Sequence, residues 1–230
     1  MGLSRKPPAG NVRRVHSTGR SLRGVIVNKV GRLVQFESMQ ERALLLRLER
    51  DPTIRDYGSQ PERFHFSDQD GQPHTYTPDF IVWRESGATE IHEVTLSHRR
   101  TQPLIRQREI AAQTICQTRG WTYLVHTEHT LPGPTELANL LALYLYRPTV
   151  YANAHVNGLA SRRLGKSGPT PLISLAQALA QDLGLPQPQV IASLCHALWH
   201  GHLETNLNQL LFRDGQVVPE AHVWRSAPDE

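Results

Sequence analysis

Two acidic residues lie at a spacing typical of metal-dependent chemistry. Asp79 follows a proline in Tyr76-Thr-Pro-Asp-Phe-Ile-Val82, and Glu93 comes fourteen residues later. On neighbouring strands of a hairpin the two carboxylates face each other, and Thr95 shares the face of Glu93 because strand side chains alternate. Converging carboxylates form an oxygen site for Mg²⁺ or Mn²⁺, which activates water and neutralises a scissile phosphate. Glu41, on the preceding helix, is a candidate third metal ligand. Taken alone, the pair also fits a turn aspartate and a surface glutamate.

The elements that must position these residues follow from capping and periodicity. Ser38 and Glu41 form a capping box for a helix that ends at Asp51-Pro52. Extended segments are predicted over 24–36, 54–66, 75–83 and 90–96, a helix over 104–119 and a strand over 121–126. This order predicts an α/β fold with one central sheet.

The C-terminal part predicts a second, smaller unit. Prolines and a glycine interrupt the chain at 132–134, and an apolar helix is expected from Glu136 to about Tyr146. The stretch 161–171, rich in Gly, Ser, Arg and Pro, is interpreted as a linker or long loop. Helices over 172–183 and 187–200, a strand over 201–207 and a hairpin over 212–218 follow in winged-helix order. The predicted organisation is a flexible basic arm (1–22), a nuclease-like domain (23–131), a linker helix and loop (132–171), and a winged-helix-like α+β domain (172–230).

Several segments in consistent order carry a resemblance to a known family. They are Phe36-Glu-Ser-Met-Gln-Glu-Arg42, Leu48-Glu-Arg-Asp-Pro52, Gln60-Pro61, Tyr76-Thr-Pro-Asp-Phe-Ile-Val82, Glu93-Val94 and Gly120-Trp-Thr-Tyr123. Over residues 24 to 130 the chain resembles the TnsA endonuclease subunits of heteromeric transposases, and it does so more loosely over 198–207. A set of such segments in order is far more specific than any one of them.

The resemblance implies a restriction-endonuclease-like mixed central sheet flanked by helices, of the Pro-Asp…(Asp/Glu)-X-Lys superfamily. It implies a Mg²⁺- or Mn²⁺-dependent nuclease that cuts the 5′ ends of a transposon in double-stranded DNA, beside an integrase-type transposase that processes the 3′ ends. By matching position, Glu41, Asp79 and Glu93 would be the metal-binding and catalytic carboxylates. The C-terminal unit would bind DNA, an AAA-type ATPase regulator, or both.

Position 95 departs from the family pattern, which has lysine where this chain has Thr95. That lysine orients the attacking water and stabilises developing charge. The chain has three lysines in all, and the candidates for replacing the charge are Lys29, Arg99, Arg100, Arg106 and His98. A non-catalytic adaptor that binds transposon-end DNA, transposase and ATPase is therefore a second hypothesis. A stand-alone restriction or junction-resolving nuclease is a third.

The positive charge of the chain is concentrated near its start. Residues 1–32 contain eight basic residues and no acidic one, and the other 198 residues carry 17 basic and 21 acidic residues. Basic segments bind phosphate through counterion release. The predicted DNA-binding residues are Arg13, Arg14, Arg20, Arg23, Lys29 and Arg32.

Other motifs exclude further classes of function. No apolar run long enough to span a bilayer and no secretory signal is present, so no membrane association is expected. The two distant cysteines favour a reducing cytoplasm. The resemblance implies that this is a bacterial cytoplasm, with nucleoid association during transposition. Cys195, His196, His200 and His202 lie among apolar residues without a complete zinc-like quartet, so packing is the preferred interpretation. Gly165-Lys-Ser167 lacks the glycine spacing of a phosphate-binding loop.

Overall fold

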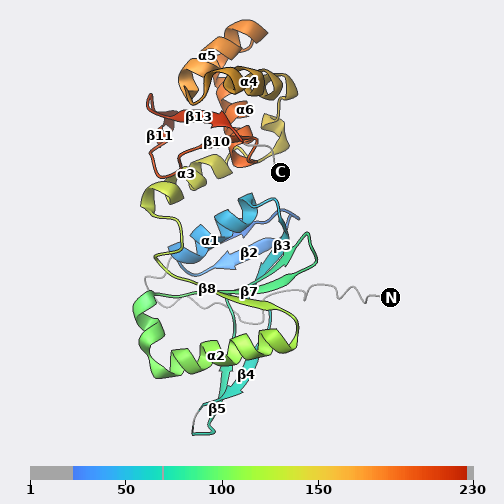
Figure 1. Cartoon of the computed structure of the whole chain (residues 1–230), viewed down its shortest axis with the longest axis vertical. Helices are drawn as coiled ribbons and strands as arrows, with labels where there is room; N and C mark the ends of the chain where they lie inside the picture. Colours follow the sequence, from blue (N-terminus) through green and yellow to red (C-terminus); the bar gives the residue numbers. More distant parts are fainter. Residues whose placement is uncertain (1–22, 69, 227–230) are drawn as a thin grey trace, which may run out of the picture. The chain divides into compact units, whose positions relative to one another are not determined.

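Two units make up the protein in the computed structural model, which describes residues 23–68 and 70–226. They span Met1–Leu131 and Pro132–Glu230, and each is described by itself. The described residues form six α-helices and a mixed central sheet, so the fold is mixed α/β, as predicted (Figure 1). Within that portion no helix is both long and apolar enough to cross a membrane. Cys116 and Cys195 are free and buried.

The first unit is built on a four-stranded sheet in the order β3-β6-β7-β8. Strands β3, β6 and β7 are antiparallel, whereas β7 and β8 are parallel. Helix α1 lies on one side of this sheet and α2 on the other (Figure 1). The elements in chain order are β1 (Gly24–Val27), β2 (Leu33–Phe36), α1 (Met39–Arg50), β3 (Ile54–Ser59), β4 (Phe64–Ser67), β5 (Pro73–Tyr76), β6 (Phe80–Arg84), β7 (Thr89–Val94), η1 (Ser97–Thr101), α2 (Pro103–Thr118) and β8 (Thr122–His126).

Helix α1 begins where the capping box predicted. The Ser38 hydroxyl oxygen accepts from the Glu41 N–H at 3.1 Å, and a Glu41 carboxylate oxygen accepts from the Glu37 N–H at 2.7 Å. The two contacts satisfy backbone donors that the first turn leaves open. One face buries leucines 44, 45, 46 and 48 against the sheet, and the helix ends at Asp51 because Pro52 disfavours helical backbone before it.

The two long extended segments of the sequence prediction are each interrupted. The first divides into β3 and β4 at Gln60, whose φ of 47° turns the chain, and its N–H donates to the Asp79 carbonyl at 2.7 Å. The second divides into β5 and β6 at Thr77-Pro78-Asp79. Proline has no N–H for a sheet ladder. The interruption therefore leaves Asp79 directly before β6, outside the regular alternation of side chains along the strand.

The β4–β5 hairpin and α2 cover the second face of the sheet. Their shared core contains Phe64, Tyr76, Ile81, Ile91, Ala112 and Cys116. Beyond that core the hairpin extends past α2 on the side away from α1 (Figure 1). A cleft therefore opens between the outer part of the hairpin and the first turns of α2.

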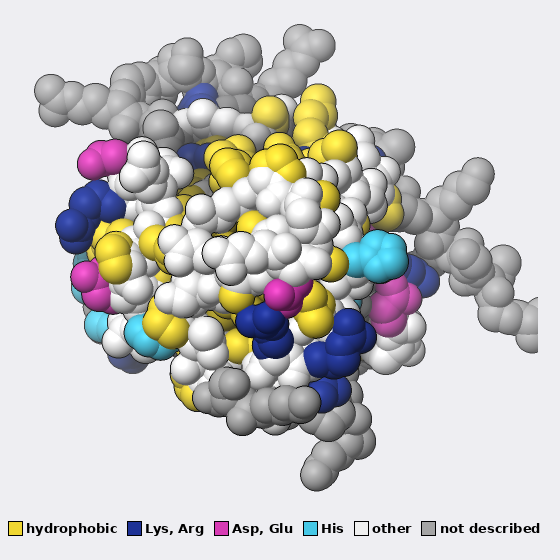
Figure 2. All heavy atoms as spheres, turned by 90° about the horizontal axis from the view of Figure 1, so that it is seen from above, with side chains coloured by type: hydrophobic (Ala, Val, Ile, Leu, Met, Phe, Trp, Pro, Cys, Tyr) yellow, Lys and Arg dark blue, Asp and Glu magenta, His cyan; other side chains and the backbone are white. Residues whose placement is uncertain are grey.

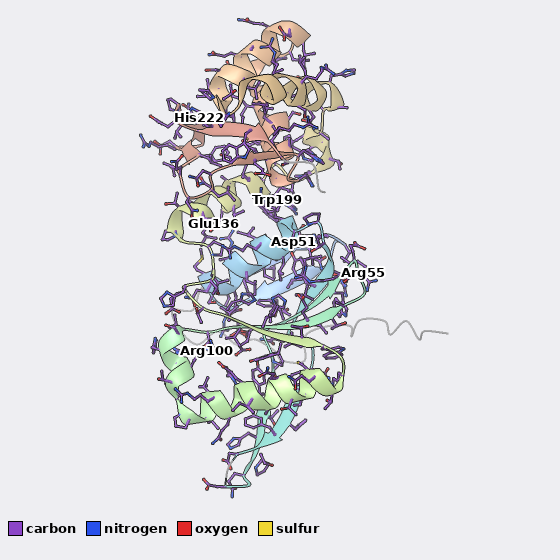
Figure 3. All side chains as sticks on the ribbon, in the orientation of Figure 1. Asp51, Arg55, Arg100, Glu136, Trp199 and His222 are labelled. Carbon is purple, nitrogen blue, oxygen red and sulfur yellow. The ribbon has the colours of Figure 1, made fainter. Side chains whose placement is uncertain are left out.

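The second unit combines helices with a small antiparallel sheet. Its elements are α3 (Pro134–Tyr144), η2 (Thr149–Tyr151), α4 (Ala154–Ser167), β9 (Thr170–Pro171), α5 (Leu172–Leu183), α6 (Gln187–Trp199), β10 (Leu203–Thr205), β11 (Phe212–Arg213), β12 (Gln216–Val217) and β13 (His222–Arg225). The sheet order is β10-β13-β9, and β11–β12 is a hairpin between β10 and β13. Trp199, at the end of α6, is 2% exposed and anchors the core (Figure 3).

The prediction of a linker or long loop over residues 161–171 is wrong. Helix α4 continues to Ser167 and is followed by β9. One face of this helix is apolar and buried at four-residue spacing, at Val156, Ala160 and Leu164. Burial of that face stabilises the helix although many of its other residues are poor helix formers or polar. The Gly, Ser and Arg residues that suggested a loop belong to this helix. Residues 132–171 therefore contain two helices, a 3₁₀ turn and a strand.

Candidate active site

Asp79 is fixed by a backbone contact across the sheet. One of its carboxylate oxygens accepts the Val94 N–H at 2.8 Å, which joins the beginning of β6 to the end of β7. Burial raises the pKa of Asp79 well above its ordinary value, and the neighbouring charges of Glu93 and Glu41 raise it further. The charges of Glu93 and Glu41 thus both act on Asp79.

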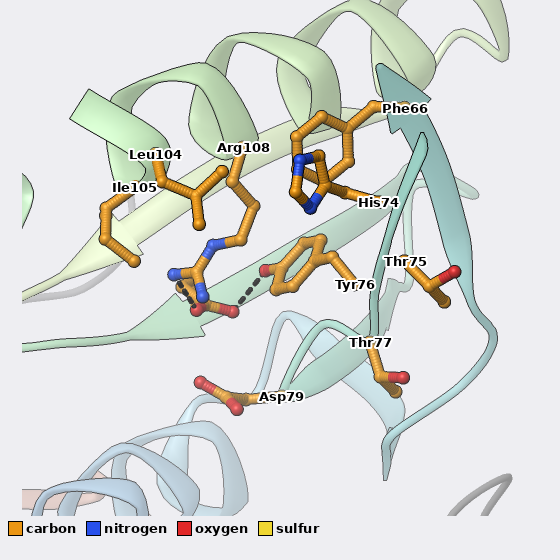
Figure 4. A pocket seen from close by; sticks show the side chains of 10 residues that line it. Phe66, His74, Thr75, Tyr76, Thr77, Asp79, Leu104, Ile105 and Arg108 are labelled. Atoms are coloured by element: carbon orange, nitrogen blue, oxygen red, sulfur yellow. Dashed lines mark hydrogen bonds and ion pairs between the residues drawn. The ribbon is translucent and has the colours of Figure 1, made fainter. Parts of the chain in front are cut away.

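Glu93 lies on β7 and is 4% exposed. The Tyr76 hydroxyl donates to one carboxylate oxygen, and the Arg108 guanidinium donates to the other at 2.7 Å (Figure 4). Burial raises the pKa of Glu93 to about 7, although Arg108 and Tyr76 act in the opposite direction. Arg108 also lies over the Tyr76 ring at 4.6 Å. A tyrosine and an arginine therefore hold this carboxylate in a single orientation.

Asp79 and Glu93 line one cavity of about 450 Å³ between the β4–β5 hairpin and α2. In Figure 4 the aromatic side chains of the hairpin lie on one side of it and the side chains of α2 on another, with Asp79 below. The lining residues are Phe66, His74, Thr75, Tyr76, Thr77, Asp79, Glu93, Leu104, Ile105 and Arg108.

Glu41 lies in a second, smaller cavity of about 70 Å³ that Asp79 also lines. Its two oxygens are held by the Ser38 hydroxyl at 3.0 Å and by the Glu37 N–H. Burial raises the pKa of Glu41. The Gln60 side-chain oxygen, in the same cavity, is buried without a hydrogen-bond partner. Asp79 and Thr77 thus line both cavities, with Glu93 in the larger one and Glu41 in the smaller one.

Thr95 lines neither cavity; its N–H pairs with the His126 carbonyl at 2.9 Å. The cations considered as replacements for the missing lysine are also absent from both linings. Lys29 donates to the carbonyls of Asp51 and Ile54, and Arg100 forms a bidentate pair with Glu109 (Figure 3). The cation that does reach the carboxylates is Arg108, which the sequence interpretation missed.

One feature of the sequence could have identified Arg108 as a candidate site residue. The apolar face of α2, which lines the cavity at its beginning and is buried further along, contains Leu104, Ile105, Ala112, Ile115 and Cys116, and Arg108 falls on that face. A charged residue at a core-facing position is rarely there without a buried partner. Its partner, Glu93, lies fifteen residues earlier in the sequence.

The predicted DNA-binding residues divide by location. Arg13, Arg14 and Arg20 lie outside the described residues. Arg32 pairs with Asp56 and lies 5.9 Å from the Trp83 ring centre, and Lys29 is half-buried on backbone carbonyls. Arg23 is described, and two of its guanidinium nitrogens are buried without a partner. In the described part the positive charge of Lys29 and Arg32 is thus held within the fold.

The oxygen donors around Asp79 suit a hard divalent cation. Mg²⁺ is typically bound by one or two carboxylates together with waters and substrate phosphate, and Asp79 and Glu93 provide two carboxylates whose pKa values burial raises. Between residues 23 and 226, Gln69 excepted, no three His, Cys, Asp or Glu side chains converge as a ready metal-binding group. The two carboxylates fit a cation that brings the rest of its ligands as water or phosphate.

Two histidines at the end of α6 have backbone partners; His196 is buried, whereas His200 is exposed. His196 donates through Nδ1 to the Tyr146 carbonyl at 2.8 Å, and His200 through Nε2 to the Arg147 carbonyl at 3.0 Å. Their rings lie 4.3 Å apart. Each histidine has a backbone partner, as the packing interpretation predicted.

One comparison with known proteins bears on this site. Residues 51–128 match the family described as TnsA-like endonuclease N terminal. The matched segment contains Asp79, Glu93 and Arg108, whereas Glu41 precedes it. A search of curated proteins found no match. The match supports a TnsA-like nuclease for this part of the chain.

Proposed function

We propose that this chain is a metal-dependent DNA endonuclease of the TnsA kind, which cuts the 5′ ends of a transposon together with a partner transposase. The observation that carries the proposal is the single cavity lined by Asp79, Glu93 and Arg108 within the segment that matches the family. On this view unit 1 has a restriction-endonuclease-like fold, and residues 23–131 form the nuclease domain.

Asp79 and Glu93 would hold Mg²⁺ or Mn²⁺, and Glu41 would add its charge from the far side of Asp79. When bound, the metal lowers the pKa of a water molecule and neutralises phosphate charge. The chain's own residues do the positioning: the Val94 N–H orients Asp79, and Tyr76 and Arg108 orient Glu93. Arg108 supplies the positive charge that Thr95 lacks, and it acts by binding phosphate, because a guanidinium stays protonated and is no base.

The second unit supports the partner part of the proposal. We propose that it is a winged helix, which its order of α4, β9, α5, α6, β10, hairpin and β13 and the sheet order β10-β13-β9 support. A winged helix binds either DNA or protein, so fold alone does not choose between them. We assign it to transposon-end DNA, to the integrase-type transposase or to an AAA-type ATPase regulator, in a complex on double-stranded DNA in the bacterial cytoplasm.

The adaptor hypothesis remains as the second candidate, and one observation favours it. The Arg108 guanidinium already donates a hydrogen bond to a carboxylate oxygen of Glu93. An arginine bound in this way competes with a metal ion for the same oxygen. In an adaptor the ion pair of Arg108 with Glu93 would persist, and the cavity would bind no metal ion.

A cleavage assay separates the two candidates. The substrate is duplex DNA that carries the transposon end, with Mg²⁺ or Mn²⁺ and the transposase encoded beside this protein. Asp79→Asn keeps the acceptor for Val94 and should abolish 5′-strand cutting. Arg108→Gln should lower the rate by about 10²-fold, comparable to loss of one oxyanion-hole donor, while Arg106→Gln on the exposed face of α2 should change it little.

The remaining outcomes of the assay also distinguish a nuclease from an adaptor. If wild type is silent but Thr95→Lys cuts, the carboxylate site is intact and the protein is a disabled nuclease kept for binding. Silence from wild type and Thr95→Lys, with end binding preserved, would establish the adaptor and overturn the catalytic assignment.

A further inference from the structure

The larger cavity has a wall that phosphodiester chemistry does not require. Phe66 and His74 face each other across the β4–β5 ladder and stack with ring centres 5.3 Å apart and planes 26° apart. An ion pair from Asp68 to the outer nitrogen of His74, at 2.7 Å, fixes the imidazole. Both rings line the cavity and remain partly exposed. A flat, fixed and accessible aromatic surface therefore stands beside the two carboxylates.

The first turns of α2 form the facing wall. Leu104 is 48% exposed although it lies at the cavity, and Ile105 lines the cavity next to it. In Figure 4 these two aliphatic side chains lie on the α2 side and the Phe66–His74 pair lies on the hairpin side. The part of the cavity between these two apolar walls, beside the carboxylates, suits a flat ligand.

Arg108 adds an unused donor between the walls. Its terminal nitrogen donates to Glu93, but its Nε is buried without a hydrogen-bond partner. A buried N–H with no acceptor costs free energy, typically about 1–3 kcal/mol, until a ligand oxygen or nitrogen accepts from it. Phosphate oxygens and the carbonyl and ring-nitrogen acceptors of nucleobases are suitable acceptors.

We infer that this cavity binds one unpaired nucleotide of a DNA strand, with its base against the Phe66–His74 stack and an acceptor at Arg108. The inference rests on the proposed function for the identity of the polymer. A cleft of about 450 Å³ is in the range of small-molecule pockets, so it has room for a single extruded nucleotide but not for a base-paired duplex. Because every base has a π-face, such a wall binds bases with little regard to sequence. An uncharged base also approaches the carboxylates without bringing a further phosphate against them.

Binding in metal-free buffer tests the inference without cleavage. A labelled duplex is compared, by fluorescence anisotropy, with the same duplex carrying one unpaired nucleotide. The wild-type protein should bind the unpaired form more tightly. Phe66→Ala and His74→Ala should each remove about 5- to 150-fold of that preference, which corresponds to the 1–3 kcal/mol of a stacked base.

Two further variants exclude a folding artefact. Phe66→Leu keeps an apolar side chain against the core and should still lose the preference, with unchanged Tm. His65→Ala, on the same hairpin but outside the cavity lining, should keep it. Equal affinity for the paired and unpaired duplexes, or an unchanged preference in Phe66→Leu, would overturn the inference.

The same samples distinguish this failure from failure of the nuclease proposal. Metal-dependent cutting of a fully paired duplex with no preference for the unpaired nucleotide refutes the inference and leaves the nuclease. A Phe66-dependent preference without cutting in any metal supports the inference and refutes the nuclease.

Discussion

At Asp79, the stability of the fold and the charge needed for metal binding oppose each other. Burial and the charges of Glu93 and Glu41 raise the pKa of Asp79, so the folded protein holds a proton that the unfolded chain releases. The folded state therefore binds more protons at pH values between the ordinary pKa and the raised one. In that window the stability of the fold decreases as the pH rises.

Replacing Asp79 by asparagine should accordingly stabilise the protein. The amide keeps an oxygen for Val94 and removes the buried charge. We expect a higher Tm than wild type at pH 8, by an amount equivalent to roughly 1–3 kcal/mol, and no difference near pH 3, where both side chains are neutral. Thermal unfolding followed by circular dichroism measures this, with Asp70→Asn in the exposed turn as the control. A lower Tm of Asp79→Asn at pH 8 would contradict the assignment.

The pKa of Glu93 predicts how metal binding depends on pH. Because burial raises it to about 7, Mg²⁺ must displace a proton from the site at pH 6 and mostly finds a carboxylate at pH 8. Below pH 7, affinity should rise by about tenfold per pH unit for each proton displaced, and flatten above it. Isothermal titration in buffers of different ionisation enthalpy counts the protons. Equal affinity at pH 6 and pH 8 would show that Glu93 does not hold the metal.

The sequence predicted the carboxylates better than their neighbours. Asp79 and Glu93 were found because their spacing reflects one hairpin, and the structure places both in one cavity. Arg108 was missed because its approach to Glu93 depends on the packing of α2 against the sheet, which no local pattern records. Thr95 shares the strand of Glu93 but lines neither cavity, because the position depends on where β7 ends.

Among the elements, α1 carries both a structural and a proposed chemical role at its first turn. Ser38 and Glu41 cap the helix, and Glu41 also faces Asp79 through the smaller cavity. The two roles are separable, because the cap needs a hydrogen-bond acceptor at position 41 and a metal site needs its charge.

We therefore expect Ser38→Ala to change the stability of the fold but not Mg²⁺ affinity, and Glu41→Gln to change Mg²⁺ affinity but not stability. Ser38→Ala removes the cap and should lower the free energy of unfolding by about 1 kcal/mol, with little change in Mg²⁺ affinity. Glu41→Gln keeps acceptor capacity at the cap and should leave the Tm nearly unchanged, while it weakens Mg²⁺ binding. Urea titration and calorimetry measure the two quantities on the same proteins. If Glu41→Gln leaves Mg²⁺ affinity unaltered, Glu41 has only its capping role.

Elements with a strong periodic pattern were predicted within one or two residues of their ends. Helices α1, α2 and α5 are examples, since each has a cap, an N-terminal proline or a terminal glycine such as Gly184, whose φ of 62° ends α5. The prediction failed where composition was used in place of periodicity, as in α4. It also failed where a long-range contact breaks a strand, as at Gln60, whose N–H is held by a residue nineteen positions later.

At the scale of the molecule, the basic residues and the candidate site occupy different parts of the sequence. Five basic residues and no acidic one lie in residues 1–22, whereas the carboxylates of the site follow Glu37. The face of the molecule shown in Figure 2 mixes basic, acidic and hydrophobic side chains. The first 22 residues therefore carry five positive charges that no acidic residue in the same segment offsets.

Deleting residues 1–22 should weaken DNA binding in a salt-dependent way. Each phosphate contact contributes about 0.9 to the slope of log affinity against log salt, so losing five cations should reduce that slope by up to about 4.5. Metal affinity and Tm should stay the same. Anisotropy titrations between 50 and 200 mM salt, about the range over which such contacts matter, measure the slope. An unchanged slope would show that the binding charge lies elsewhere in the chain.

The hairpin that supplies the aromatic wall has a mechanical consequence. A two-stranded ribbon is only marginally stable without support, and β4–β5 is a sheet of its own, separate from the four central strands. Its inner residues, Phe64 and Tyr76, are anchored in the core, but Phe66 and His74 are one step further out. The position of the aromatic wall therefore depends on contacts within the hairpin, such as that of Asp68 with His74, whereas Asp79 and Glu93 are held by the central sheet and α2.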